Sequence, residues 1–282
     1  MNVIRAEQAR SEQARSHQDD LIVHVEGIGW WSPGVVDWSH AASLLRDGAT
    51  LPIDGNAQPA ATILPPHERR RAPAPVLLAC EVASQACAMA DRAAASLPCV
   101  FASMHGDIVI TDELCATLAI DPLAVSPTRF HNSVHNAPVG HWTVATQCRA
   151  ASSAVSAWHG SFAAGLLESA VLACADATPV LFAAYDVAAR GALAGVLQAA
   201  LPFGTALVVN AERGPRTLAT LRLRHESSAA PPLAASATHV AYALAAPIAN
   251  SLPLFVALAR ATPCRVQLRN GAATSLSIEV LA

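Results

Sequence analysis

The sequence predicts an α/β fold in which strands alternate with covering helices. Short β-branched or apolar runs, typical of buried strands, alternate along the chain with segments of helical length and composition. Hydrophobic residues make up 53% of the 282 residues and charged residues 14%, which excludes disorder over most of the length. Residues 1–20 are polar, and we expect a disordered arm or frayed helix there. No composition break follows, so we expect residues 21–282 to form a single domain.

Two helices are predicted between the first two strands. Residues 21–29 form a β-branched run ending in glycines, which is typical of a buried strand that leads into a tight turn. Residues 38–46 and 75–95 have helical length and composition, and a proline-rich loop to about residue 71 separates them. The apolar run at 99–103 predicts the next strand.

The middle of the chain is predicted to contain less regular structure. Thr111 is placed to cap a helix over 113–119, because a threonine hydroxyl accepts a hydrogen bond from a free first-turn amide. We expect residues 126–139 to be mostly loop. A helix at 160–174 and a buried strand at 179–185 then resume the alternation.

The last part of the chain is predicted to hold two strand pairs and one helix. The expected strands are 205–210 with 217–224 and 264–269 with 275–281, and the expected helix is 250–260. A Gly-Pro turn joins the first pair, and Asn270 with Gly271 forms the turn of the second.

Charge excludes one class of partner and favours another. The net charge is −3, and no basic block is longer than the three arginines at 69–71, so nucleic-acid binding is excluded. With few charges to cover its surface, a domain of this size exposes apolar area or covers it with another chain. Composition alone therefore favours an obligate partner.

We expect no cofactor and no metal. Gly27 and Gly29 follow a strand as in a dinucleotide fingerprint, but Ser32 stands where the third glycine is required, so a structural turn is expected. His131 and His135 are four residues apart, the spacing of two ligands on one helix face. No carboxylate lies between them, and the segment is rich in loop-forming residues.

The cysteines and the apolar segments indicate a cytoplasmic protein without a membrane span. The seven cysteines are scattered and include no C-x-x-C pair, so we expect small buried side chains in a reducing compartment. Residues 227–259 lack charges, but four prolines interrupt them and alanine gives little driving force for insertion.

Three motifs carry a family resemblance. Residues 27–34 are GIGWWSPG, residues 68–71 are ERRR, and residues 126–142 are SPTRFHNSVHNAPVGHW. The chain resembles β-ketoacyl synthases of the thiolase fold, and within them the short chain length factors of aryl polyene and xanthomonadin-type pigment clusters. The resemblance covers about residues 22–225 and weakens after that. It implies an α/β thiolase-like layered α-β-α-β-α fold with a largely complete N-terminal half and a strongly truncated C-terminal half.

The resemblance also implies that the synthase nucleophile is absent. Residues 136–143 resemble the synthase N-x-x-A-G-H-x-T/S helix, and residues 180–186 resemble its V-x-V-A-G-G-x-E strand. A gap-free count between them places His159 where a synthase has its cysteine, and Cys148 falls one helix too early. An acyl-imidazole is too labile to store a growing chain. The second-half motifs with the synthase histidines have no counterpart either, so we expect no catalytic residue.

The resemblance implies a non-catalytic subunit that forms a heterodimer with an active β-ketoacyl synthase and shapes its acyl tunnel, with an acyl carrier protein as a further partner. The segment 104–135 is the candidate tunnel wall. The candidate tunnel- or partner-facing residues are Phe130 and Val134, with Leu114 and Leu118 behind them; alternatively, all four are ordinary core residues. The candidate loop-shaping residues are His131, Asn132, His135 and Asn136.

Two other functions stay open. One is a stand-alone acyl hydrolase or acyltransferase that uses His159 or Cys148. The other is a homodimeric scaffold or a carrier-protein docking module that leaves product length unchanged.

Overall fold

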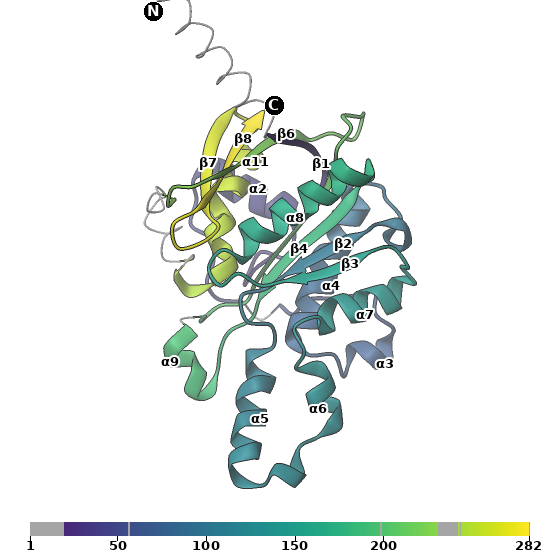
Figure 1. The fold of residues 1–282 in the computed structure, drawn as a ribbon, viewed down its shortest axis with the longest axis vertical. Helices are drawn as coiled ribbons and strands as arrows, with labels where there is room; N and C mark the ends of the chain where they lie inside the picture. The colour runs from purple at the N-terminus through teal and green to yellow at the C-terminus, as the bar shows by residue number, and fades with distance from the viewer. Residues whose placement is uncertain (1–19, 56, 198, 231–241, 243, 282) are drawn as a thin grey trace, which may run out of the picture.

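The strands form one mixed eight-stranded sheet (Figure 1). The computed structural model describes residues 20–55, 57–197, 199–230, 242 and 244–281, so the arm expected at 1–20 lies outside it except for Asp20. The strand order is β3-β2-β4-β5-β1-β6-β8-β7. β2 pairs in parallel with both β3 and β4, and the other neighbours are antiparallel.

The strands confirm most of the sequence-based expectations. They are β1 (Leu21–Trp31), β2 (Cys99–Ala102), β3 (Ser152–Val155), β4 (Val180–Asp186), β5 (Phe203–Asn210), β6 (Ala219–Glu226), β7 (Cys264–Arg269) and β8 (Ser275–Leu281). Seven of these were predicted to within a few residues. The eighth, β3, was missed because its sequence, SSAV, is short and half polar. It lies at the edge of the sheet.

The helices confirm the expected alternation and correct its details. The α-helices are α2 (Trp38–Asp47), α3 (Pro66–Arg69), α4 (Ala74–Met89), α5 (Ile108–Ile120), α6 (Pro127–Asn132), α7 (Ala137–Thr146), α8 (Ser161–Asp176), α9 (Ala194–Leu197) and α11 (Leu252–Arg260). Short 3₁₀ turns are η1 (Ala94–Ser96), η2 (Pro122–Ala124), η3 (Gly191–Leu193) and η4 (Pro247–Ser251).

Three expectations about the middle of the chain were wrong. The helix expected at 113–119 starts at Ile108 because Asp107 is its cap, with its carboxylate accepting from the Ile110 amide at 3.0 Å. The Thr111 hydroxyl instead donates to the Asp107 carbonyl, a bond inside the helix. The segment 126–139 is not mostly loop, because Ser126 caps α6 and Pro138 lies in the first turn of α7, where proline is tolerated.

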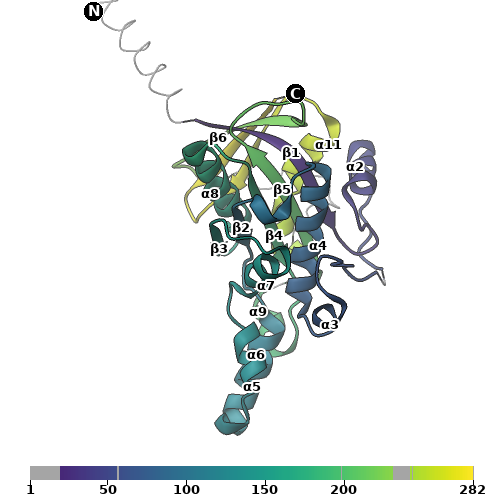
Figure 2. The same cartoon turned by 90° about the vertical axis from the view of Figure 1, so that its right-hand side faces the viewer.

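Helices cover both faces of the sheet (Figure 2). α4 and α7 pack on one face, and α8, α11 and α2 pack on the other. Gly27 and Gly29 permit the closeness of α4 to β1, because a side chain at either position would collide with the carbonyl oxygens of Ala86 and Val82. The glycine pair is therefore structural, as expected.

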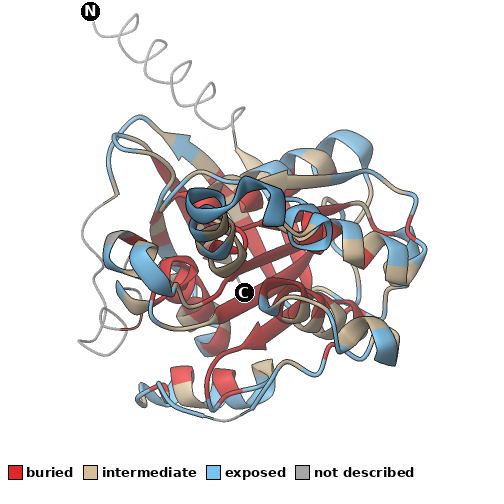
Figure 3. Cartoon of the chain, turned by 90° about the horizontal axis from the view of Figure 1, so that it is seen from below, coloured by how far each residue is buried: buried red, intermediate tan, exposed pale blue. Residues whose placement is uncertain are grey.

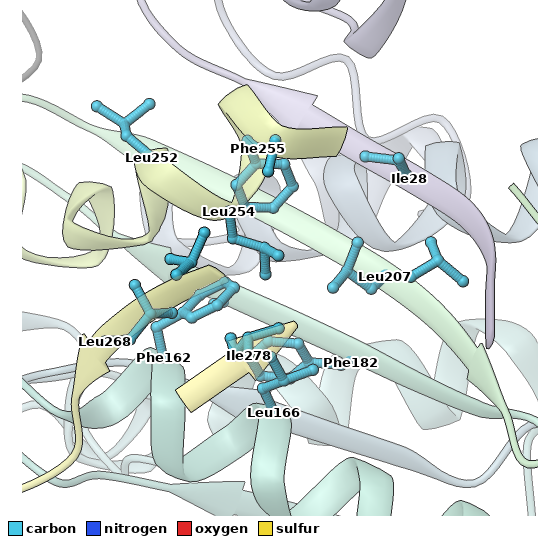
Figure 4. Packing of buried hydrophobic residues seen from close by; sticks show 14 of the residues in the cluster. Ile28, Phe162, Leu166, Phe182, Leu207, Leu252, Leu254, Phe255, Leu268 and Ile278 are labelled. Atoms are coloured by element: carbon cyan, nitrogen blue, oxygen red, sulfur yellow. The ribbon is translucent and has the colours of Figure 1, made fainter. Parts of the chain in front are cut away.

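An aromatic and aliphatic core joins α8 and α11 to the sheet (Figure 4). Phe162 of α8 meets Phe182 of β4 and Phe255 of α11, with ring centroids 5.1 and 6.0 Å apart. Trp30 meets the Phe255 ring edge-on at 5.6 Å. The strands that follow β6 continue the same sheet, so among the described residues a second, separate sheet layer is absent. This agrees with the expected reduction of the C-terminal half.

α5, η2 and α6 form a helical hairpin, residues 108–132, that extends away from the sheet (Figures 1 and 2). Elsewhere, the described part of the uncharged segment 227–259 contributes η4 and α11 to the core. No helix in the described part of the chain is long and apolar enough to cross a bilayer.

Candidate functional site

The hairpin is apolar and yet hardly buried. Only Ile108 of the 13 residues of α5 is buried, and none of α6 is. Ile120 and Leu123, at the tip, are 87% and 95% exposed. Figure 3 is viewed from the hairpin end, and the helices nearest the viewer are mostly exposed or half-buried. An apolar helix in a soluble protein normally packs one face against a hydrophobic core. The described residues provide almost no core beside this hairpin.

Four of the candidate residues lie on or beside this hairpin. Phe130 and Val134 are 63% and 45% exposed, and Leu118 is also exposed, whereas Leu114 is half-buried. The alternative that all four are ordinary core residues is therefore wrong for three of them within this chain. We call the exposed set Leu118, Ile120, Leu123, Phe130 and Val134 the hairpin surface.

A buried polar network holds the root of the hairpin. Asp186, at the end of β4, is fully buried, and its Oδ1 accepts from the Ser103 hydroxyl at 2.7 Å and from the Met104 amide at 3.0 Å. The Ser103 hydroxyl in turn accepts from the Gly106 amide at 2.8 Å. His135 Nε2 lies 3.0 Å from the Ser103 carbonyl oxygen. The chain entering α5 and the chain leaving α6 are thus tied to one point of the sheet.

Burial dominates the electrostatics of this root. It raises the pKa of Asp186, while nearby His105 and the hydrogen bonds from Ser103 and Met104 act in the opposite direction. Asp186 Oδ2 and His105 Nε2 are both buried and have no hydrogen-bond partner among the described residues. Two unmatched polar atoms at this depth are costly, which makes the network sensitive to its protonation state.

Of the four candidate loop-shaping residues, His135 alone has a side-chain hydrogen bond that the described residues show. His131 and Asn136 are exposed and Asn132 is half-buried. Asn136 precedes α7 without a capping side-chain bond.

His159 lies in the turn from β3 into α8. Trp158 takes a left-handed conformation, φ 53°, and Gly160 is the cap residue of α8. The Ser161 hydroxyl closes the turn by accepting from the Ala157 amide at 2.9 Å and donating to the Trp158 carbonyl at 2.7 Å. A strand-to-helix turn with one strained residue is a geometry in which some enzymes carry a nucleophile.

The surroundings of His159 favour a neutral imidazole. Burial, and then the positive charge of Arg269, lower the pKa of His159. Its carbonyl oxygen accepts a hydrogen bond from Asn250 Nδ2. A side chain at Gly160 would lie 2.7 Å from the Asn270 carbonyl, so the turn between β7 and β8 covers this position.

Cys148 precedes β3 and His159 follows it, so the two lie beyond opposite ends of this strand. Its side chain is buried, and its Sγ donates to the Leu97 carbonyl at 3.3 Å. Cys87 and Cys99 are its neighbours, and burial raises the pKa of both their thiols to about 12. The structure does not bring Cys148 and His159 together, and the part of the chain that it describes holds no group of three or more potential metal ligands.

Sequence reasoning missed several residues of this region. Ile120 and Leu123 flank Asp121 and Pro122, and an apolar pair around a proline turn could have indicated an exposed tip. Asp186 was identified only as part of a strand motif. No local signal relates it to Ser103, which is 83 positions away in the chain.

Comparisons with known proteins agree with the sequence motifs. The family described as β-ketoacyl synthase, N-terminal domain, matches residues 38–261. No curated protein matches the chain.

Solved structures show the same fold. A ketosynthase (ApeO) in complex with its chain length factor (ApeC) from Xenorhabdus doucetiae matches with a TM-score of 0.68 and 23% identity, over 92% of this chain and 99% of that one. A type II polyketide acyl-carrier protein complex with its ketosynthase, AntDE:AntF, matches at 0.69 and 13%, over 92% and 99%. A β-ketoacyl synthase from Burkholderia phymatum matches at 0.59 and 14%, over 83% and 70%. The expected thiolase-like fold is confirmed.

Proposed function

Because the chain belongs to the family of β-ketoacyl synthase N-terminal domains, we propose that it is a non-catalytic subunit resembling a chain length factor. In this proposal it forms a heterodimer with an active β-ketoacyl synthase and shapes the acyl tunnel of that partner during polyene or fatty-acyl chain elongation.

The observation that carries the proposal is the exposed hairpin surface. Large apolar side chains that are exposed together on one projecting element often mark a contact with another protein. These lie on a hairpin that extends from the sheet, whose direction is fixed at the root by Asp186 and Ser103. An apolar hairpin that extends from the domain is suited to form part of the wall of a partner's tunnel. Phe130 and Val134 would limit the tunnel by excluding volume.

The turn before α8 supports the non-catalytic part of the proposal. A half-buried, neutral imidazole at His159 replaces the thiolate that would accept the acyl chain. Cys148 is buried, and the hydrogen bond that its Sγ makes among the described residues goes to a backbone carbonyl and not to a base, so it is a poor nucleophile. Both features weaken the alternative of a stand-alone acyl hydrolase or acyltransferase.

The solved structures provide further support. The chain covers nearly all of a chain from a complex between a ketosynthase and its chain length factor, but only 70% of the Burkholderia β-ketoacyl synthase. The AntDE:AntF structure contains an acyl-carrier protein, which makes a carrier protein the second partner to test.

Co-expression with the synthase encoded beside it tests the proposal. We expect the two chains to co-purify in equal amounts, and Phe130→Ala and Val134→Trp to lengthen and shorten the product respectively, with Leu218→Ala as an exposed apolar control outside the hairpin. Failure to co-purify would overturn the heterodimer, and unchanged product length in an intact complex would overturn the tunnel role. Acyl-thioester turnover by the purified chain, lost in His159→Ala or Cys148→Ala, would establish the enzyme alternative.

A further inference from the structure

A cavity of about 820 Å³ lies between the base of the hairpin and the start of α4. Its walls are formed by residues 53–55 and 57–59, the first turns of α4, both hairpin helices, and Val187, Ala188 and Arg190. Its volume is within the range of small-molecule sites in proteins. His159 and Cys148 are not among its lining residues, so it is separate from the position of the synthase nucleophile.

Hydrogen-bond donors collect at this cavity. Trp31 lines it and is 4% exposed, and its indole N–H has no partner among the described residues. α4, sixteen residues long, begins there at Ala74 without a capping side chain; because Pro73 and Pro75 have no N–H, its first turn has the amides of Ala74 and Val76, and of these two residues Ala74 lines the cavity. Arg71 and Arg190 also line it, and for neither guanidinium does the described part of the chain show a carboxylate within ion-pair distance.

Three carboxylates line the cavity beside three arginines. Glu113 is paired with Arg129 at 2.8 Å, and both line the cavity, so they cancel. Asp107 is engaged as the cap of α5, where it accepts from the Ile110 amide. Asp54 and Asp107 therefore remain beside Arg71 and Arg190, and within the described residues neither carboxylate lies within ion-pair distance of these arginines.

Much of the remaining wall is apolar. Leu77, Leu78, Val109, Ile110 and Leu201 contribute aliphatic side chains from three different segments. A buried donor, a free helix N-terminus and two unpaired arginines select an anion, and aliphatic walls beside them select a chain attached to it.

We propose that this cavity binds an amphipathic anion, with a carboxylate or phosphate head held by Arg71, Arg190, the Trp31 indole N–H and the start of α4, and an alkyl chain lying against the leucines. The site belongs to this chain alone and does not depend on the proposed pairing with a synthase. Carboxylate and phosphate heads share this chemistry and come from different ligands, so the test includes both.

Calorimetric titration of the full chain, or of its complex if the chain is soluble only there, decides the matter. The probes are octanoate, octyl phosphate, octanol and inorganic phosphate. We expect saturable binding of at least one octyl anion, at least tenfold tighter than octanol and inorganic phosphate. A tenfold preference between the two octyl anions would identify the head group, and equal affinities would leave the shared anion chemistry as proposed. Equal binding of octanol, or no saturable binding of either octyl anion, would overturn the site.

Variants assign the binding to this cavity. Arg71→Gln with Arg190→Gln should weaken octyl-anion binding at least tenfold, and Trp31→Phe should weaken it less, since one donor is removed. Arg70→Gln is the matched control, because Arg70 is an exposed arginine next to Arg71 that does not line the cavity. Trp31 is buried, so thermal unfolding of that variant is measured first; if it is unstable, the arginine variants decide. Unchanged affinity in the double arginine variant would place the ligand elsewhere.

Discussion

α8 and α5 have similar apolar content and opposite surroundings. In α8, eight of sixteen residues are buried, and Phe162 and Leu166 pack against β4 and α11 (Figure 4). In α5, one of thirteen residues is buried. Both sequences favour a helix. The difference lies in what covers them: the sheet of this chain covers α8, and no described part of this chain covers most of α5.

This contrast shows what apolar composition measures. Apolar composition indicates that a surface is covered in the functional state. It does not indicate whether the same chain or a partner covers it. A helix covered by its own chain contributes to folding, whereas a helix covered by a partner contributes to association. Substitutions in α8 should therefore change the free energy of unfolding, whereas substitutions in α5 should change the affinity for a partner.

The largest expected effect is on folding. Phe162→Ala should lower the free energy of unfolding by about 3–5 kcal/mol, because it removes a fully buried ring that touches Phe182 and Phe255. Phe130→Ala should change it by less than about 0.5 kcal/mol, since that ring is exposed in the isolated chain. Urea denaturation of the two variants measures both values. A large loss in Phe130→Ala would mean that the hairpin is covered in the isolated chain.

The buried elements of the core could be predicted from the sequence. The β-branched run at 21–29 and the apolar run at 179–185 have the length and composition of buried strands, and both are central in the sheet. The exposure of the hairpin could not be predicted from the sequence. Residues 108–120 have helix-forming composition that fits burial by this chain or by another, and only the arrangement in space distinguishes the two.

The next effect is on association. Ile120→Asp with Leu123→Asp should weaken binding of the partner synthase by about 2–3 kcal/mol, or roughly 30- to 150-fold in Kd, because two apolar contacts are lost and two charges must be desolvated. Stability of the isolated chain should barely change, as both side chains are exposed. Surface plasmon resonance against the partner gives the Kd.

Leu218→Asp is the matched control for that pair, since Leu218 is an exposed leucine in the turn between β5 and β6. It should leave the partner's Kd within about twofold of the unmodified chain. An equal loss in the control would mean that the effect comes from charge in general. No loss in the hairpin variant would remove the hairpin from the interface.

A smaller effect is expected where the two regions join. Burial raises the folded-state pKa of Asp186 above its ordinary value of 3.8. As pH rises above about 4, the unfolded chain releases this proton while the folded chain keeps it, so the folded state binds more protons and its stability falls with rising pH. The slope from one group is at most about 1.4 kcal/mol per pH unit.

Asp186→Asn tests this linkage. The amide oxygen can still accept from Ser103 and Met104, and the titrating group is gone. Denaturation at several pH values between 4 and 7 should show that the variant lacks part of the decline seen in the unmodified chain. Asp107, whose pKa burial also raises, is unchanged in both proteins, so the difference isolates Asp186. Parallel curves would show that Asp186 ionises normally in the folded state.

The candidate site could be predicted in part for a similar physical reason. Motif spacing placed His159 at the position of the synthase cysteine, and the structure has it in the turn between β3 and α8. Motif spacing could not show that Asn250 and the turn at Asn270 cover it, because those contacts join segments about a hundred residues apart. The same is true of the Ser103–Asp186 bond and of the cavity at Trp31.

The smallest expected effect concerns the ion pair between the two hairpin helices. Glu113 and Arg129 are 2.8 Å apart and both are about half exposed, so Arg129→Gln should cost no more than about 1 kcal/mol of unfolding free energy, and less at high salt. Urea denaturation at low and high ionic strength measures this. A loss well above that value, unaffected by salt, would mean that the pair is removed from water in the isolated chain, as it would be if two copies met through their hairpins. Self-association would then cover the surface that we assign to a synthase. In solution α5 would be buried as α8 is, and the two helices would differ only in the monomer.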